Sequence, residues 1–203
     1  MHRREEPGSA DDLPPVLPEA AIDGDVQRLE DGVGPLFHRL YRARIRDARL
    51  SPEELIGHLR SDPNRATPTE FARFLRARGA GRKIVVGEEM VVRMPGPWDG
   101  PVRVAATTDT SFRLATLSGH LEAGQIEFRA RQSDGLLFFE IESWARSGDR
   151  LSNLLYHHLR MAKEVQLHMW TSFLERVADV AEGRLTGGVE IVSRKMEDPP
   201  AFS

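Results

Sequence analysis

The chain has 203 residues, of which 40% are hydrophobic and 29% charged, so it is long enough to form one globular domain with tails. It contains no cysteine, which excludes disulfides, thiolate nucleophiles and thiolate metal ligands. No apolar run approaches the roughly 20 residues of a membrane-spanning helix, and the first residues lack the apolar stretch of a secretory signal. We therefore expect a cytoplasmic protein.

Arginine dominates the basic residues, since the chain has 25 Arg and 3 Lys against 31 acidic residues, for a net charge of −3. Nucleic-acid binding usually needs a concentrated positive surface, because phosphate contacts supply most of the affinity. The densest run of arginines, Arg39 to Arg49, alternates with apolar residues as on the solvent face of a strand. We expect no nucleic-acid partner.

The two ends of the chain have the composition of tails. Residues 1–20 carry several prolines and few large apolar groups, so they cannot bury enough surface to offset their ordering entropy and are predicted to form a disordered arm. Residues 183–203 are predicted to be a tail in which Val189, Ile191 and Val192 could add a short strand. The domain itself is predicted over 21–182.

The domain is predicted to begin with a strand over 36–46, because Tyr41 and Ile45 alternate with Arg42 and Arg44. A helix is the alternative there, since Arg and Leu favour helices. Two short helices are predicted next, over 51–60 and 67–78. Each starts with a Ser or Thr at the N-cap, then Pro, then an acid in the first turn.

Five strands are predicted between residues 83 and 146, over 83–94, 101–108, 112–116, 126–130 and 136–146. Each shows apolar alternation, and short loops with Gly, Pro, Ser or Asp separate them. Strands joined by such short connections form an antiparallel meander.

The clearest element is a helix over 151–182, a segment with neither Pro nor Gly. At the standard rise it would be on the order of 45 Å long, enough to cross a whole sheet. Its apolar stripe recurs at helical spacing: Leu151, Leu155, Ala162, Val165, Met169, Phe173, Val177 and Val180. The order of strand, short helices, meander and long C-terminal helix predicts an α+β fold of the helix-grip type, with the stripe on the concave face of the sheet.

A motif in the predicted turn after 112–116 resembles a segment of the DUF1990 family, whose members are functionally uncharacterised. The matching residues are Thr116, Leu117, Gly119, His120, Gly124 and Phe128, and the resemblance runs from about Gly87 to Glu182. It implies a fold akin to the START and Bet v 1-like helix-grip proteins, many of which hold an apolar ligand between sheet and helix.

The chain departs from that family pattern at four positions. Ser118 and Leu121 stand where the family tends to have prolines, and Gln125 and Ile126 stand where it tends to have paired acids. If those carboxylates act as acid and base in relatives, this chain should lack that chemistry.

His120 is the first candidate site residue. In one interpretation Glu122 orients the imidazole as an acid, a base or a ligand-anchoring donor. In the other, which we favour, the ring caps the turn by hydrogen bonds to nearby backbone, and the glycines supply positive φ angles.

Glu140, Glu142 and Trp144 alternate along the last predicted strand and share one face. On a concave face the two carboxylates would repel each other, the pKa of one would rise, and Glu140 would become a candidate general acid. On the convex face they would be solvated. We favour the convex face, because the alternate residues are apolar.

The predicted ligand pocket is lined by the helical stripe, with Leu155, Val165, Met169 and Phe173 as candidate contacts. Trp98 lies in a loop of prolines and glycines and is either a lid over the pocket or an aromatic that pins the loop. Simple core packing is the alternative for the stripe. No metal site is expected, because His157 and His168 would lie roughly 16 Å apart on a helix.

Three functions fit these patterns. The favoured hypothesis is a binding protein that holds a small apolar or amphipathic molecule between sheet and helix. An enzyme of cyclase or dehydratase type, with His120 or Glu140 as general acid or base, is the second. An interaction protein with a filled core is the third. No cofactor is expected, since the chain has no phosphate loop or dinucleotide fingerprint.

Overall fold

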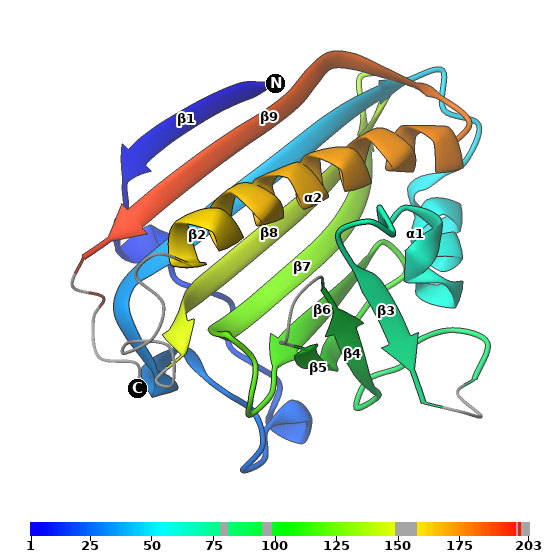
Figure 1. Ribbon diagram of the computed structural model, residues 1–203. Helices are drawn as coiled ribbons and strands as arrows, with labels where there is room; N and C mark the ends of the chain where they lie inside the picture. The colour runs from blue at the N-terminus through cyan, green and yellow to red at the C-terminus, as the bar shows by residue number, and fades with distance from the viewer. Residues whose placement is uncertain (78–80, 95–98, 149–157, 198, 200–203) are drawn as a thin grey trace.

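The computed structural model describes residues 1–77, 81–94, 99–148, 158–197 and 199 of the chain, with the side chains of α2 described from residue 166 onward. Within this part of the chain, nine strands form one sheet in the order β1-β9-β2-β8-β7-β6-β5-β4-β3. The sheet is strongly curved, and α2 crosses its concave face (Figure 1). The elements are β1 (His2–Pro7), β2 (Gly32–Arg46), α1 (Pro52–Ser61), β3 (Arg73–Arg76), β4 (Glu89–Arg93), β5 (Asp99–Thr107), β6 (Ser111–Thr116), β7 (Glu122–Ser133), β8 (Leu136–Gly148), α2 (His158–Val180) and β9 (Arg184–Met196).

The predicted meander is present as β4 to β8, each antiparallel to the next. The hairpin between β7 and β8 turns at Asp134 and Gly135, which have φ angles of 51° and 73°. Two successive positive φ angles make the tight turn whose twist matches that of the flanking strands.

The first predicted strand and the first predicted helix are also present. β2 begins earlier than expected, at Gly32, and keeps Tyr41, Ala43 and Ile45 buried on the concave side. At the start of α1, the Ser51 hydroxyl accepts a hydrogen bond from the Glu54 amide at 3.2 Å, and the Glu54 carboxylate accepts one from the Ser51 amide at 2.8 Å. This reciprocal cap satisfies two amides that would otherwise lack partners.

The prediction of a second helix over 67–78 is wrong, because the chain there forms one turn and then β3. The Thr67 hydroxyl donates back to the Pro63 carbonyl at 2.8 Å, so it does not cap a helix. Phe74 is buried, and its amide donates to the Asn64 side chain at 2.8 Å. Pairing of β3 with β4 then fixes the extended backbone and overrides the local start signal.

The N-terminal segment differs from the predicted disordered arm, and the predicted tail contains the strand expected around Val189, Ile191 and Val192, although that strand is longer, Arg184–Met196. Residues 2–7 form β1, which pairs in parallel with β9, and β9 lies between β1 and β2. Residues 9–31 run across the convex face, where Ala21, Val26 and Leu29 are buried. A few buried apolar residues and the hydrogen bonds of strand pairing stabilise these segments, and the amino-acid composition alone does not reveal either contribution. Strands of the sheet therefore lie outside the predicted boundaries 21–182.

The predicted length of the long helix is not confirmed. The described helix, α2, runs from His158 to Val180, and residues 149–157 lie outside the described part of the chain. The helix is also not the last element, since β9 follows it. No helix in the described ranges is long and apolar enough to cross a bilayer.

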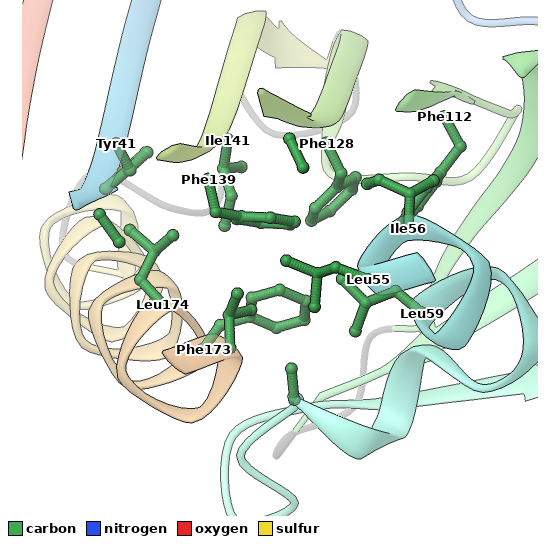
Figure 2. Close-up of a cluster of buried hydrophobic side chains, with 14 of the residues drawn as sticks. Tyr41, Leu55, Ile56, Leu59, Phe112, Phe128, Phe139, Ile141, Phe173 and Leu174 are labelled. Atoms are coloured by element: carbon green, nitrogen blue, oxygen red, sulfur yellow. The ribbon is translucent and has the colours of Figure 1, made fainter. Parts of the chain in front are cut away.

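The core lies between α2, α1 and the concave face of the sheet. Phe173 of α2 points at the aromatic rings of the sheet, with ring centroids 5.7 Å from Phe128 and 6.2 Å from Phe139. Leu55 and Leu59 of α1 close the cluster from the other side (Figure 2). The described part of the predicted stripe, with Met169, Phe173 and Val177 buried, therefore meets the hollow of the sheet.

We expect Phe173→Ala to lower the free energy of unfolding by about 3–5 kcal/mol, because it removes a fully buried ring and leaves a cavity. Phe138→Ala is the matched control, since Phe138 is half-buried on the convex face beneath Arg131. Urea denaturation of both variants measures the difference. Equal losses would show that α2 does not hold the two layers together.

Candidate functional site

A cavity of about 80 Å³ lies between the sheet and α2. Strands β4 to β8 form its floor and α2 its roof. Its walls are mostly apolar, and a few polar side chains face into it. The apolar residues include Val92, Met94, Val102, Leu114, Ile126, Phe128, Met169 and Trp170, and the polar ones include Thr116, His120, Glu122 and Gln166.

His120 enters this cavity from the turn between β6 and β7. Its amide donates to the Leu117 carbonyl at 2.9 Å, which closes the turn. The ring Nδ1 lies 2.9 Å from the Glu122 amide nitrogen and 3.0 Å from the Glu122 carbonyl oxygen. Nδ1 is therefore engaged by backbone in either neutral tautomer, and Nε2 has no partner among the described residues. The interpretation of the ring as a turn cap agrees with these contacts.

The surroundings keep the His120 ring neutral. Burial lowers the pKa of His120, although the nearby Glu122 carboxylate and the Glu122 backbone act to raise it. The Glu122 carboxylate accepts a hydrogen bond from Gln166 Nε2 at 3.0 Å. Gly100 of β5 lies against the other side of the ring, where an added Cβ would come within 2.9 Å of Nε2.

The motif around His120 shapes the hairpin that presents the ring. The Thr116 hydroxyl accepts from the Gly124 amide at 2.9 Å and donates to the Gln27 carbonyl at 3.0 Å. Gly119 has a φ angle of +95°, which favours glycine. Gly124 has a φ angle of +153° and lies so close to β8 that an added Cβ would be 1.9 Å from the Trp144 carbonyl oxygen.

The other predicted pocket residues fall in different places. Met169 lines the cavity, whereas Phe173 lies in the packed core. Val165 belongs to α2, but its side chain is outside the described part, and so are Trp98 and Leu155. Gln166 was not predicted, although it lies three residues before Met169 and therefore on the same side of the helix.

Glu140 lies on the convex face, opposite the cavity, as the alternation favoured. It is not solvated, however, because it is only 2% exposed and accepts hydrogen bonds from Arg42 Nε at 2.6 Å and Arg129 Nε at 2.7 Å. Burial alone would raise the pKa of Glu140, but the bonds from these two guanidinium groups outweigh it and lower the pKa. A carboxylate held ionised in this way cannot serve as a general acid near neutral pH.

A buried histidine that the sequence did not single out lies beside this ion pair. His38 of β2 places Nδ1 2.8 Å from Asp12 and Nε2 2.6 Å from Glu142, and its ring stacks on Trp144 with centroids 5.3 Å apart. Asp12 comes from the segment predicted to be disordered, so no sequence signal links it to His38. Among the described residues, no group of His, Asp and Glu has metal-binding geometry.

We expect the free energy of unfolding to fall as the pH drops below about 4. Burial acts to raise the pKa of Asp12, Glu140 and Glu142, but hydrogen bonds lower all three pKa values below those of the unfolded chain. Their contribution is therefore present above the unfolded pKa and is lost as protons bind. Glu140→Gln should flatten this pH dependence and Glu53→Gln, on the exposed side of α1, should not. Urea denaturation at a series of pH values tests this, and parallel slopes would contradict it.

We expect Gly124→Ala to lower the free energy of unfolding by about 3 kcal/mol, because the added methyl group collides with the backbone of β8. Gly24→Ala is the matched control, since an added Cβ at Gly24 would meet nothing within 4 Å. Denaturation curves for both variants decide the matter. A stable, soluble Gly124→Ala variant would mean that the hairpin tolerates a shift of β8.

Solved structures similar to this chain share little sequence with it. A hypothetical protein, jhp0584 from Helicobacter pylori, is 10% identical, with 81% of this chain and 94% of that chain covered and a TM-score of 0.50, a likeness of fold alone. XoxI from Bacillus cereus is 11% identical over 71% of this chain and 95% of its own, with a TM-score of 0.48. Ara h 8.0201 is 12% identical over 70% of this chain and 99% of its own, with a TM-score of 0.47.

No curated protein matches the chain significantly in sequence. A family model described as a domain of unknown function, DUF1990, matches residues 69–176, which is just over half of the chain. The match includes the hairpin with His120 and most of α2. The chain therefore belongs to the DUF1990 family.

Proposed function

We propose that this protein binds a small apolar or amphipathic molecule between the concave face of the sheet and α2. The observation that carries the proposal is the cavity itself, which combines apolar walls with a few polar groups, of which His120, Glu122 and Gln166 are linked by hydrogen bonds. Binding sites for small molecules usually have this composition, because apolar walls supply affinity and the polar groups fix orientation.

His120, Glu122 and Gln166 form the polar end of this site. Since the Nε2 atom of His120 has no partner within the described ranges, it can donate or accept one hydrogen bond, according to the tautomer. Gln166 uses its amide nitrogen on Glu122, which leaves its carbonyl oxygen as an acceptor. A hydroxyl or carbonyl group of a ligand fits such a set better than an ion, because the ring is neutral and the nearby carboxylate repels anions.

The volume limits what this end of the site can hold. About 80 Å³ is room for a few atoms, since one water takes about 30 Å³ in the liquid and drug-sized ligands fill about 300–1,000 Å³. We therefore assign the polar end of an amphipathic ligand to the cavity. Met169 and Trp170 of α2 would contact the start of its apolar part.

An interaction protein with a filled core is the second candidate. The observation in its favour is the dense aromatic packing beside the cavity, where Trp170 and Phe173 stand 5.8 Å apart and both contact Phe128. In that case the cavity would hold only ordered water, and the functional surface would lie elsewhere.

Native mass spectrometry of the purified chain, incubated with a panel of long-chain alcohols, aldehydes and fatty acids, distinguishes these two functions. We expect retention of a neutral amphiphile, with an affinity that drops roughly two- to tenfold in His120→Asn through loss of one hydrogen bond. His58→Asn is the matched control, because His58 is exposed on α1.

A chain that retains no member of the panel would favour the filled-core protein. Retention that is unchanged in His120→Asn would place the ligand outside the cavity. The urea stability of both variants must be measured alongside, because His120 also closes its own turn.

A further inference from the structure

A second hollow lies on the far side of α2 from the His120 cavity. It has a volume of about 430 Å³ and is formed by β1, β9 and β2, with Leu167 of α2 as one wall. The strands β1 and β9 extend the sheet past the edge of the helix there (Figure 1). This volume falls within the usual range for small-molecule sites.

The floor of this groove is a grid of side chains from three adjacent strands. Because Cα partners in neighbouring strands face the same side, the registers set out three rows across the sheet. These rows are Arg3–Ile191–Tyr41, Glu5–Ser193–Arg39 and Pro7–Lys195–Phe37. Basic groups, the acid Glu5, hydroxyls and apolar side chains thus share one surface.

Arg39 is the cation of this groove that lacks a carboxylate partner within the described part of the chain. Its guanidinium lies over the Phe37 ring, 4.7 Å from the centroid, which holds it in place. The acids of β1 are already paired, since Glu5 accepts from Arg3 at 2.6 Å and Glu6 accepts from Arg194 at 3.0 Å. The groove therefore keeps a positive charge at Arg39.

Two hydroxyl groups lie next to Arg39 without a hydrogen-bond partner among the described residues. Ser193 is directly opposite Arg39 on β9, and Tyr41 follows two residues later on β2, so all three face the groove. Burial raises the pKa of Tyr41 to about 12, with Arg39 acting in the opposite direction, so its hydroxyl remains a donor. A guanidinium with two adjacent hydroxyl donors matches the oxygens of a carboxylate.

We propose that this groove is a second binding site, for a small organic carboxylate with an apolar body. Arg39, Tyr41 and Ser193 hold the carboxylate. The apolar body lies against Ile191, which is 1% exposed, and Leu167, which is 9% exposed. The site differs from the His120 cavity in place and in charge, so it stands or falls separately from the function proposed above.

The test is isothermal titration of the full chain with 2-naphthoate and with 2-naphthalenemethanol, which has the same rings but no charge. We expect the carboxylate to bind at least about tenfold more tightly than the alcohol, because an ion pair supplies the difference. Arg39→Gln should abolish this preference, and Tyr41→Phe should weaken naphthoate binding severalfold.

Arg44→Gln is the matched control, because Arg44 lies on the same strand but on the convex face, near Glu190. It should retain the preference for the carboxylate. Amide chemical shifts of labelled protein should change at residues 37–41 and 191–195 when naphthoate is added.

Three affinity results would each overturn the proposal. They are the absence of naphthoate binding at millimolar concentration, equal affinity for the alcohol, and undiminished binding in Arg39→Gln. Shift changes centred on His120 and Met169 would move the ligand to the other cavity and would also overturn it.

Discussion

The contact between Phe173 of α2 and the rings of Phe128 and Phe139 joins the two layers of this fold. A buried aromatic ring contributes more apolar area than most residues, and here one ring reaches β7 and β8 at once. The position of α2 over the sheet follows from it. Because the helix is narrower than the sheet, a hollow remains on each side, the His120 cavity toward β4–β8 and the Arg39 groove toward β1, β9 and β2.

The convex face is held by a different kind of interaction. Its ion pairs connect neighbouring strands, and Glu140 accepts hydrogen bonds from guanidinium groups on both β2 and β7. The segment 9–31 packs beside this network, and Asp12 joins it through His38. The concave face is therefore packed by apolar area, whereas the convex face combines paired charges with the apolar residues of segment 9–31.

The elements that were predicted correctly are those with a clear pattern in their own residues. The alternation in β2 and the Ser-Pro-Glu-Glu start of α1 each contain their own evidence, and both are present. The same start signal failed at Thr67, because the hydroxyl that should cap a helix bonds backward to Pro63 and the pairing with β4 decides the backbone. The residues of a strand alone do not determine which other strand it pairs with.

The candidate site was predictable to a similar extent. His120 and Met169 could be named from a turn motif and a helical stripe, and both line the cavity. Gln166 lies on the same side of the helix as Met169, but a stripe defined by apolar residues does not include it. Arg39 was grouped with Arg42 and Arg44, although the alternation already placed it on the other face. The cluster of His38, Asp12 and Glu142 could not be foreseen, because its members meet only through the register of β2 with β8 and the path of the N-terminal segment.

The order of the strands has a consequence for how the protein can assemble. β2 lies between β8 and β9, and β9 in turn lies between β2 and β1. Three adjacent strands thus come from the beginning and the far end of the sequence. Pairing between them closes long loops of chain, so we expect these hydrogen bonds to form late in folding. During synthesis, β1 and one edge of β2 stay unpaired until residues 184–196 have been made. This edge is therefore open to pairing with strands of other chains while the protein is being synthesised.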